Sequence, residues 1–203
     1  APSPSASTLI HHDVPTGWRP AVEVATPELA ALRDAVLANR TARHVCVVTT
    51  GAGGIRRAQL AAGLAFGLAQ RGARVLLVEA DFDGPDLHQA LDISAPPGGG
   101  FSQQLNARRQ DGHVRPWQVV RCAPQLHVLV EGRMRSPGIS GTGEFERAML
   151  ELREQHDVVI VHGPPQQRAS ELATLRPLAQ GVLLAPAQGA ASLEFGETAL
   201  RNL

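Results

Sequence analysis

Residues 45–57 read Val-Cys-Val-Val-Thr-Thr-Gly-Ala-Gly-Gly-Ile-Arg-Arg, and this stretch decides the fold. Its first five residues are apolar or β-branched, which is typical of a buried strand. The glycines that follow, Gly51, Gly53 and Gly54, allow a tight turn whose backbone N–H groups can surround a phosphate. The apolar residues from Ala58 onward predict a helix. A strand, a glycine-rich loop and a helix in this order are typical of a phosphate-binding loop.

The end of this loop departs from the motif that binds nucleotides. The motif is Gly-x-x-x-x-Gly-Lys-Ser/Thr, in which the lysine reaches the outer phosphates and the hydroxyl holds Mg²⁺. Gly51 fits the first position, but Arg56, Arg57 and Ala58 replace the last three residues, and the chain contains no lysine. Arg56 brings a long side chain where bare backbone is needed, and Ala58 cannot bind a metal. We therefore expect that the fold of the P-loop domain is retained and that its phosphate and Mg²⁺ chemistry is lost.

Length and composition restrict the remaining possibilities. A chain of 203 residues with 43% apolar content suits one α/β domain. The 19 basic residues balance 19 acidic ones, so no general electrostatic attraction favours nucleic acid, and none is predicted as a partner. No apolar run is long enough to span a membrane, so membrane contact is expected only through a partner or a missing upstream region.

The remaining pattern predicts a doubly wound, mainly parallel sheet. Four prolines within residues 1–25 indicate a linker or flexible arm, which contains His11 and His12 without an assigned role. A P-loop NTPase-like α/β domain is expected over residues 26–203. Its predicted helices cover residues 26–39, 58–71 and 143–155; its predicted strands cover 45–49, 75–79, 126–130, 158–161 and 182–185; residues 106–116 are predicted as a loop.

The order of these segments resembles the cytoplasmic domain of bacterial tyrosine kinases that accompany polysaccharide co-polymerases, within the MinD/ParA group of P-loop ATPases. The resemblance covers about residues 26–200. It rests on matches that occur in the family's order, at residues 49–51, 64–72, 75–81 with Pro85 and Leu87-His88, 126–129 with Gly132, 157–165 and 178–184. It implies the MinD/ParA fold and a setting in polysaccharide synthesis or export.

The departures from this family fall on its chemistry. The resemblance places two Mg²⁺-organising aspartates at residues 79 and 81, and this chain has Glu79 and Asp81 there. Asp83 stands where the kinases often have an arginine. His162 replaces the Walker B aspartate, although Mg²⁺ prefers a hard anionic oxygen. A metal site made of His162, Glu79 and Asp81 is not favoured, and no metal is predicted.

Features used by the kinases for autophosphorylation and assembly are also missing. The chain has no tyrosine, so it cannot phosphorylate itself on that residue. Of the family's Glu-x-x-Arg-x-x-Arg oligomerisation pattern, the helix at residues 29–37 keeps only Arg33. The chain stops at Leu203, soon after a helix is expected to begin, so the domain is predicted to lack its last strand and to be a fragment.

These observations favour a catalytically inactive P-loop domain that acts by binding within a bacterial exopolysaccharide or capsule assembly. Its expected partner is a polysaccharide co-polymerase or an active kinase homologue, at the cytoplasmic face of the inner membrane. No cofactor is predicted beyond weak binding of ATP or ADP. The expected contact surface includes Arg33, Arg56 and Arg57, although the last two are more simply interpreted as solvated residues at a helix start.

Two alternatives remain open. One is a weak ATPase or kinase in which Arg57 replaces the lysine and Asp81 with Glu79 holds Mg²⁺. The other is a MinD-like pseudo-ATPase of polar localisation or pilus assembly.

Overall fold

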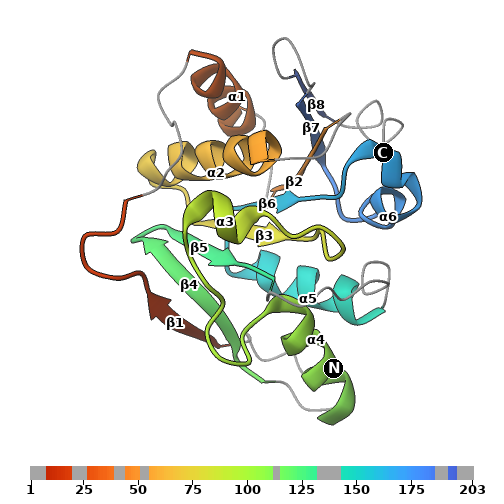
Figure 1. Cartoon of the computed structure of the whole chain (residues 1–203). Coiled ribbons are helices and arrows are strands. Elements are labelled where there is room, and N and C mark those ends of the chain that lie inside the picture. The colour runs from red at the N-terminus through yellow and green to blue at the C-terminus, as the bar shows by residue number, and fades with distance from the viewer. Residues whose placement is uncertain are drawn as a thin grey trace.

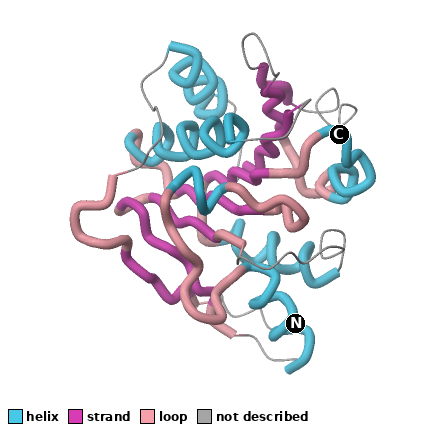
Figure 2. Tube along the Cα trace, viewed as in Figure 1, coloured by secondary structure: helices cyan, strands magenta, loops and turns pink. Residues whose placement is uncertain are grey.

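The computed structural model describes residues 8–19, 27–38, 44–50, 55–111, 115–131, 143–185 and 192–195. Within them, one eight-stranded sheet carries helices on both faces (Figures 1 and 2). The elements in chain order are β1 (Leu9–Asp13), α1 (Pro27–Ala38), β2 (His44–Thr50), α2 (Ile55–Gln70), β3 (Val75–Glu79), α3 (Leu87–Leu91), α4 (Phe101–Asp111), β4 (Trp117–Ala123), β5 (Leu126–Leu129), α5 (Gly143–Glu154), β6 (Val158–His162), a 3₁₀ turn (Gln166–Arg168), α6 (Ala169–Thr174), β7 (Gly181–Ala185) and β8 (Ser192–Phe195).

The strand order is β1-β4-β5-β3-β6-β2-β7-β8. The five central strands from β5 to β7 are all parallel, whereas β4 pairs antiparallel with β5 and β8 antiparallel with β7. Parallel pairing brings the carboxyl ends of β3, β6 and β2 to the same edge of the sheet. In open α/β sheets, ligands bind at this edge.

The hydrophobic core consists of two clusters, one on each face of the sheet. Alternation along β2 divides its side chains between them: Cys46 and Val48 pack with α1, α2 and α3, while Val45 and Val47 pack with α4, α5 and α6. Figure 1 shows α1 to α3 on one side of the sheet and α5 with α4 on the other. Strands covered on both faces explain the nearly continuous apolar runs in the sequence.

The predicted doubly wound, mainly parallel fold is confirmed. The helix expected at 143–155 is α5, and the strands expected at 75–79 and 158–161 are β3 and β6. The prediction missed three strands, β1, β4 and β8, and the helices α3, α4 and α6. Residues 106–111, expected in a loop, continue α4, and β8 forms near the chain end where a helix was expected.

Part of the predicted flexible arm belongs to the sheet. Residues 9–13 form β1, which pairs in parallel with β4 from Leu9 to Asp13. Further along, Trp18 donates from Nε1 to the Leu91 carbonyl at 3.0 Å and stacks on Phe66. The arm interpretation is therefore wrong for these residues. Residues 1–7 and 20–26, including the expected domain boundary, lie outside the described part.

Candidate functional site

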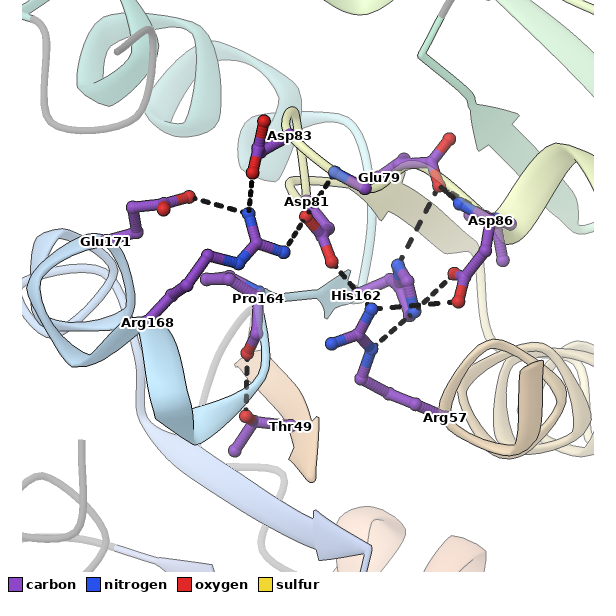
Figure 3. A network of polar contacts seen from close by, with 12 residues as sticks. Thr49, Arg57, Glu79, Asp81, Asp83, Asp86, His162, Pro164, Arg168 and Glu171 are labelled. Atoms are coloured by element: carbon purple, nitrogen blue, oxygen red, sulfur yellow. Dashed lines mark hydrogen bonds and ion pairs between the residues drawn. The ribbon is translucent and has the colours of Figure 1, made fainter. Parts of the chain in front are cut away.

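The candidate site lies at the carboxyl ends of β3 and β6, next to the start of α2. Strand register places Glu79, the last residue of β3, beside His162, the last residue of β6. Asp81 follows two residues after β3, and Arg57 projects from the first turn of α2. The structure thus brings together four of the residues that the sequence singled out (Figure 3).

Arg57 is buried in this site, with 1% of its surface exposed. Its Nη2 donates to Oδ2 of Asp81 at 2.7 Å, and its Nε donates to Nε2 of His162 at 2.9 Å. The same Nη2 lies 3.7 Å from Oδ2 of Asp86. The interpretation of Arg57 as a solvated helix-start residue is therefore wrong. The burial of this side chain does not support its predicted role in a contact surface.

Asp81 binds a second arginine. Arg168, which ends the 3₁₀ turn after β6, donates from Nη2 to Oδ1 of Asp81, and the Gly84 amide donates to the same oxygen at 2.9 Å. Arg168 Nη1 also contacts Glu171 at 3.1 Å and lies 3.7 Å from Asp83. Both oxygens of Asp81 are thus engaged, and each faces a guanidinium group.

His162 is neutral in this environment. Burial, and secondarily the charge of Arg57, hold the pKa of its imidazole well below the usual range. Because Nε2 accepts the hydrogen bond from Arg57, the ring proton belongs on Nδ1, which lies 3.9 Å from Oε1 of Glu79. His162 therefore supplies a hydrogen-bond acceptor to Arg57 at the position where the kinase family has an aspartate.

Glu79 anchors the backbone around the site. Oε1 accepts from the amides of Asp86 at 2.8 Å and Leu87 at 2.7 Å, and Oε2 accepts from the amide of Glu131 at 3.0 Å. The side chain is fully buried, and burial raises the pKa of this carboxyl to about 8. Glu79 joins β3 to the start of α3 and the end of β5, so its carboxyl is already committed within the protein.

Asp86 and Arg168 were missed in the sequence. Asp86 stands at the N-cap of α3, and its Oδ1 lies 3.1 Å from Nε2 of His162. Burial raises the pKa of its carboxyl to about 6 against the opposing effect of Arg57. The residue before a short helix gave only a weak signal, and Arg168 gave none, because its place depends on the turn after Pro165.

Among the described residues, one set of three ligand atoms is already compact enough for a metal ion: those of Glu79, Asp86 and His162 lie within 4.8 Å of one another. The guanidinium of Arg57 already contacts His162 and faces Asp86 from this side. A divalent cation there would meet a fixed positive charge and a carboxyl saturated by backbone amides. As arranged, the set holds an arginine rather than providing an open metal site.

The other predicted site residues divide into three groups. Ala58, in the first turn of α2, is fully buried and offers no ligand atom. Gly51, Gly53 and Gly54, and the side chain of Arg56, lie outside the described part. Arg33 on α1 is 21% exposed and pairs with Asp34 at 2.8 Å, so its role in a contact surface stays a prediction.

No protein-family model matches the sequence, and no curated protein matches it. Solved structures do match. The chimerical protein CapA2B2 is 20% identical with a TM-score of 0.67, over 91% of this chain and 82% of that one. The BceF tyrosine kinase domain is 26% identical with a TM-score of 0.54, over 77% of this chain and 59% of that one.

A ParA family ATPase from Chlorobium tepidum is more distant. It is 16% identical with a TM-score of 0.52, over 70% of this chain and 60% of that one. In the described part of the chain, no helix has the length and apolarity that a membrane span requires. The comparisons identify the chain as having the α/β P-loop fold that bacterial tyrosine kinase domains share with ParA ATPases.

Proposed function

We propose that this chain is a catalytically inactive P-loop domain that acts as a binding and regulatory module in bacterial exopolysaccharide or capsule synthesis. One observation carries the proposal. Arg57, at the predicted position of the P-loop lysine, pairs with Asp81, the carboxylate expected to organise Mg²⁺. Arg168 pairs with the other oxygen of Asp81.

The energetics of this arrangement oppose catalysis. Phosphoryl transfer depends on a cation at the outer phosphates and on a correctly held Mg²⁺. To bind Mg²⁺, Asp81 would have to release a guanidinium that is as buried as itself, and separating a buried ion pair costs about 3–5 kcal/mol. Ala58 offers no hydroxyl, and the neutral His162 offers no anionic oxygen. Three separate contributions to metal binding are therefore lost together.

A second candidate function has one observation in its favour. Nη1 of Arg57 is buried, and among the described residues no group accepts a hydrogen bond from it. An anion at the loop could accept from this atom, which would give weak binding of ATP or ADP. This candidate retains binding but not hydrolysis, since the contacts of Arg57 to Asp81 and His162 would persist.

A thermal-shift titration with ATP and ADP, with and without Mg²⁺, separates these two functions. The proposal expects no shift at millimolar nucleotide, whereas a ligand at 100 times its Kd would stabilise the fold by about 2.7 kcal/mol. A Mg²⁺-independent shift that is weakened by Arg57→Lys supports the second candidate. A shift that requires Mg²⁺ contradicts the proposal that Asp81 is held by arginines and is not available to a metal ion.

The partner and the location are further parts of the proposal. The resemblance in sequence supports a polysaccharide co-polymerase or an active kinase homologue as partner, with the chain at the inner face of the inner membrane. Of the three predicted contact arginines, Arg33 on α1 is the one whose described side chain is partly exposed. Arg33→Glu should reduce co-purification with that partner, whereas Arg147→Glu, on α5 at the opposite face of the sheet, should not. Equal recovery of both variants would remove α1 from the contact surface.

The MinD-like alternative predicts different partners. Affinity purification of the tagged chain from its source cells, followed by mass spectrometry, should recover components of polysaccharide synthesis. Recovery of pilus or cell-division components instead would favour the alternative.

A further inference from the structure

Three histidines gather at the edge of the sheet opposite the candidate site. His127 is the second residue of β5 and pairs with Leu76 near the start of β3, whereas Glu79 ends that strand. His156 lies between α5 and β6, and His11 belongs to the edge strand β1. None of the three takes part in the proposed function.

Two of their nitrogens already face each other. Nδ1 of His127 lies 2.9 Å from Nε2 of His156. The other nitrogen of His156, Nδ1, lies 2.7 Å from the Leu152 carbonyl, which can only accept, so Nδ1 carries the proton and Nε2 presents its lone pair. Histidine ligands of metals are commonly oriented in this way, by donating their second N–H to a carbonyl.

The third imidazole lies against the other two. The ring centroids of His11 and His127 are 4.6 Å apart, with the planes inclined at 47°. His156 is buried and His11 is exposed. The three rings do not yet form a compact set of ligand atoms, so the His11 ring must rotate toward the pair to bind an ion. Two of the side chains come from strands of the sheet, and the third comes from the connection between α5 and β6.

The positive charges near the three rings are balanced by carboxylates. The nearby Arg121 is paired with Asp13 at 2.6 Å, and Arg74 is paired with Asp157 at 2.8 Å. The two arginine charges are thus each matched by a carboxylate.

We infer that His127 and His156, with His11 as a third ligand, form a binding site for a transition-metal ion of the Zn²⁺ class. Imidazole nitrogens suit Zn²⁺, Cu²⁺ and Ni²⁺, whereas Mg²⁺ and Ca²⁺ prefer oxygen. Two nitrogens about 2.0–2.1 Å from a tetrahedral Zn²⁺ are about 3.4 Å apart, so the pair must open by about 0.5 Å. Both rings must also turn, so that their lone pairs point at the ion instead of at each other. Zn²⁺ would replace the Nδ1 proton of His127, which moves to Nε2 of the same ring.

A bound ion would tie β1 to β5 and to the end of α5. The edge strand β1 is five residues long and is paired on one side only. The site would therefore make the attachment of this strand depend on metal. The same two rings without metal are simply a hydrogen-bonded neutral pair, and the experiment must distinguish these two states.

The test is a Zn²⁺ titration of the chelator-treated whole chain, read by competition with a chromophoric indicator in excess Mg²⁺. We expect one tight equivalent that Mg²⁺ does not displace. Affinity should fall at least about tenfold in His127→Gln and His156→Gln, and also in His11→Gln. His12→Gln is the matched control, since His12 is on the same strand but contacts Gln118 instead. It should bind as the wild type does.

A second measurement needs no variant and covers the case in which His156→Gln does not fold. With ¹⁵N-labelled histidine, Zn²⁺ should shift the NMR resonances of His127 Nδ1 and His156 Nε2. Binding that is unchanged in His127→Gln, shifts confined to His162, or no tight equivalent at all would each overturn the inference. Unchanged binding in His11→Gln alone would overturn the assignment of the third ligand.

Discussion

The guanidinium of Arg57 and the carboxylate of Asp81 form a buried ion pair, with Nη2 and Oδ2 2.7 Å apart and each side chain 2% exposed. The resemblance to the kinase family places Arg57 at the P-loop lysine and Asp81 at a Mg²⁺-organising carboxylate. The pair therefore joins the two charges that an active site would use on phosphate and on metal. Pairing with each other satisfies both charges without a ligand.

Removing Arg57 should cost much more stability than removing an exposed arginine. Arg57→Ala leaves Asp81 buried beside Arg168 alone, and loss of one partner from a buried pair costs about 3–5 kcal/mol. Arg74→Ala is the control. The side chain of Arg74 is 54% exposed and that of its partner Asp157 is 27% exposed, and ion pairs at the surface contribute about 0–1 kcal/mol. Urea denaturation measures both. Equal losses would contradict the structural role given to Arg57.

Glu79→Ala should loosen three backbone segments at once. The change leaves the amides of Asp86, Leu87 and Glu131 without their acceptor, and each unsatisfied buried donor costs about 1–3 kcal/mol. Hydrogen exchange of these three amides should accelerate in Glu79→Ala. In the control variant Glu144→Ala, at the start of α5, exchange of the same amides should match the wild type. Protection that persists in Glu79→Ala would show that the carboxyl is not the anchor.

Acid should destabilise the protein through His162. Its folded-state pKa lies well below the value of about 6.5 in the unfolded chain, so below pH 6.5 only the unfolded chain takes up this proton. This contribution to the free energy of unfolding is present above pH 6.5 and is lost as the pH falls. Comparison with His162→Gln isolates it: the slope against pH should decrease by up to about 1.4 kcal/mol per pH unit. His12→Gln is the control, and the dependence of its unfolding free energy on pH should match that of the wild type. An unchanged slope in His162→Gln would contradict a buried neutral ring.

The sequence predicted the sheet, because apolar runs of this length alternate with helices. The resemblance to the kinase family, and not the strand pattern, placed Glu79, Asp81 and His162 in one vestigial site. It could not predict the direction of Arg57, which depends on how the side chain leaves α2 and on the neutral state of His162. Arg168 and Asp86 reach the site through turns whose geometry no local pattern specifies. The strand β1 was missed because five residues, Leu-Ile-His-His-Asp, lie among prolines and form an edge with only one neighbour.

The most direct test of the central claim is Mg²⁺-dependent ATP turnover by the purified chain, compared with a variant whose loop is rebuilt by Arg56→Gly, Arg57→Lys and Ala58→Thr. An active kinase homologue serves as the positive control. The account predicts no turnover above background in either protein, because His162 still replaces the Walker B carboxylate in both. Mg²⁺-dependent turnover by the unmodified chain that disappears in Asp81→Ala would contradict it.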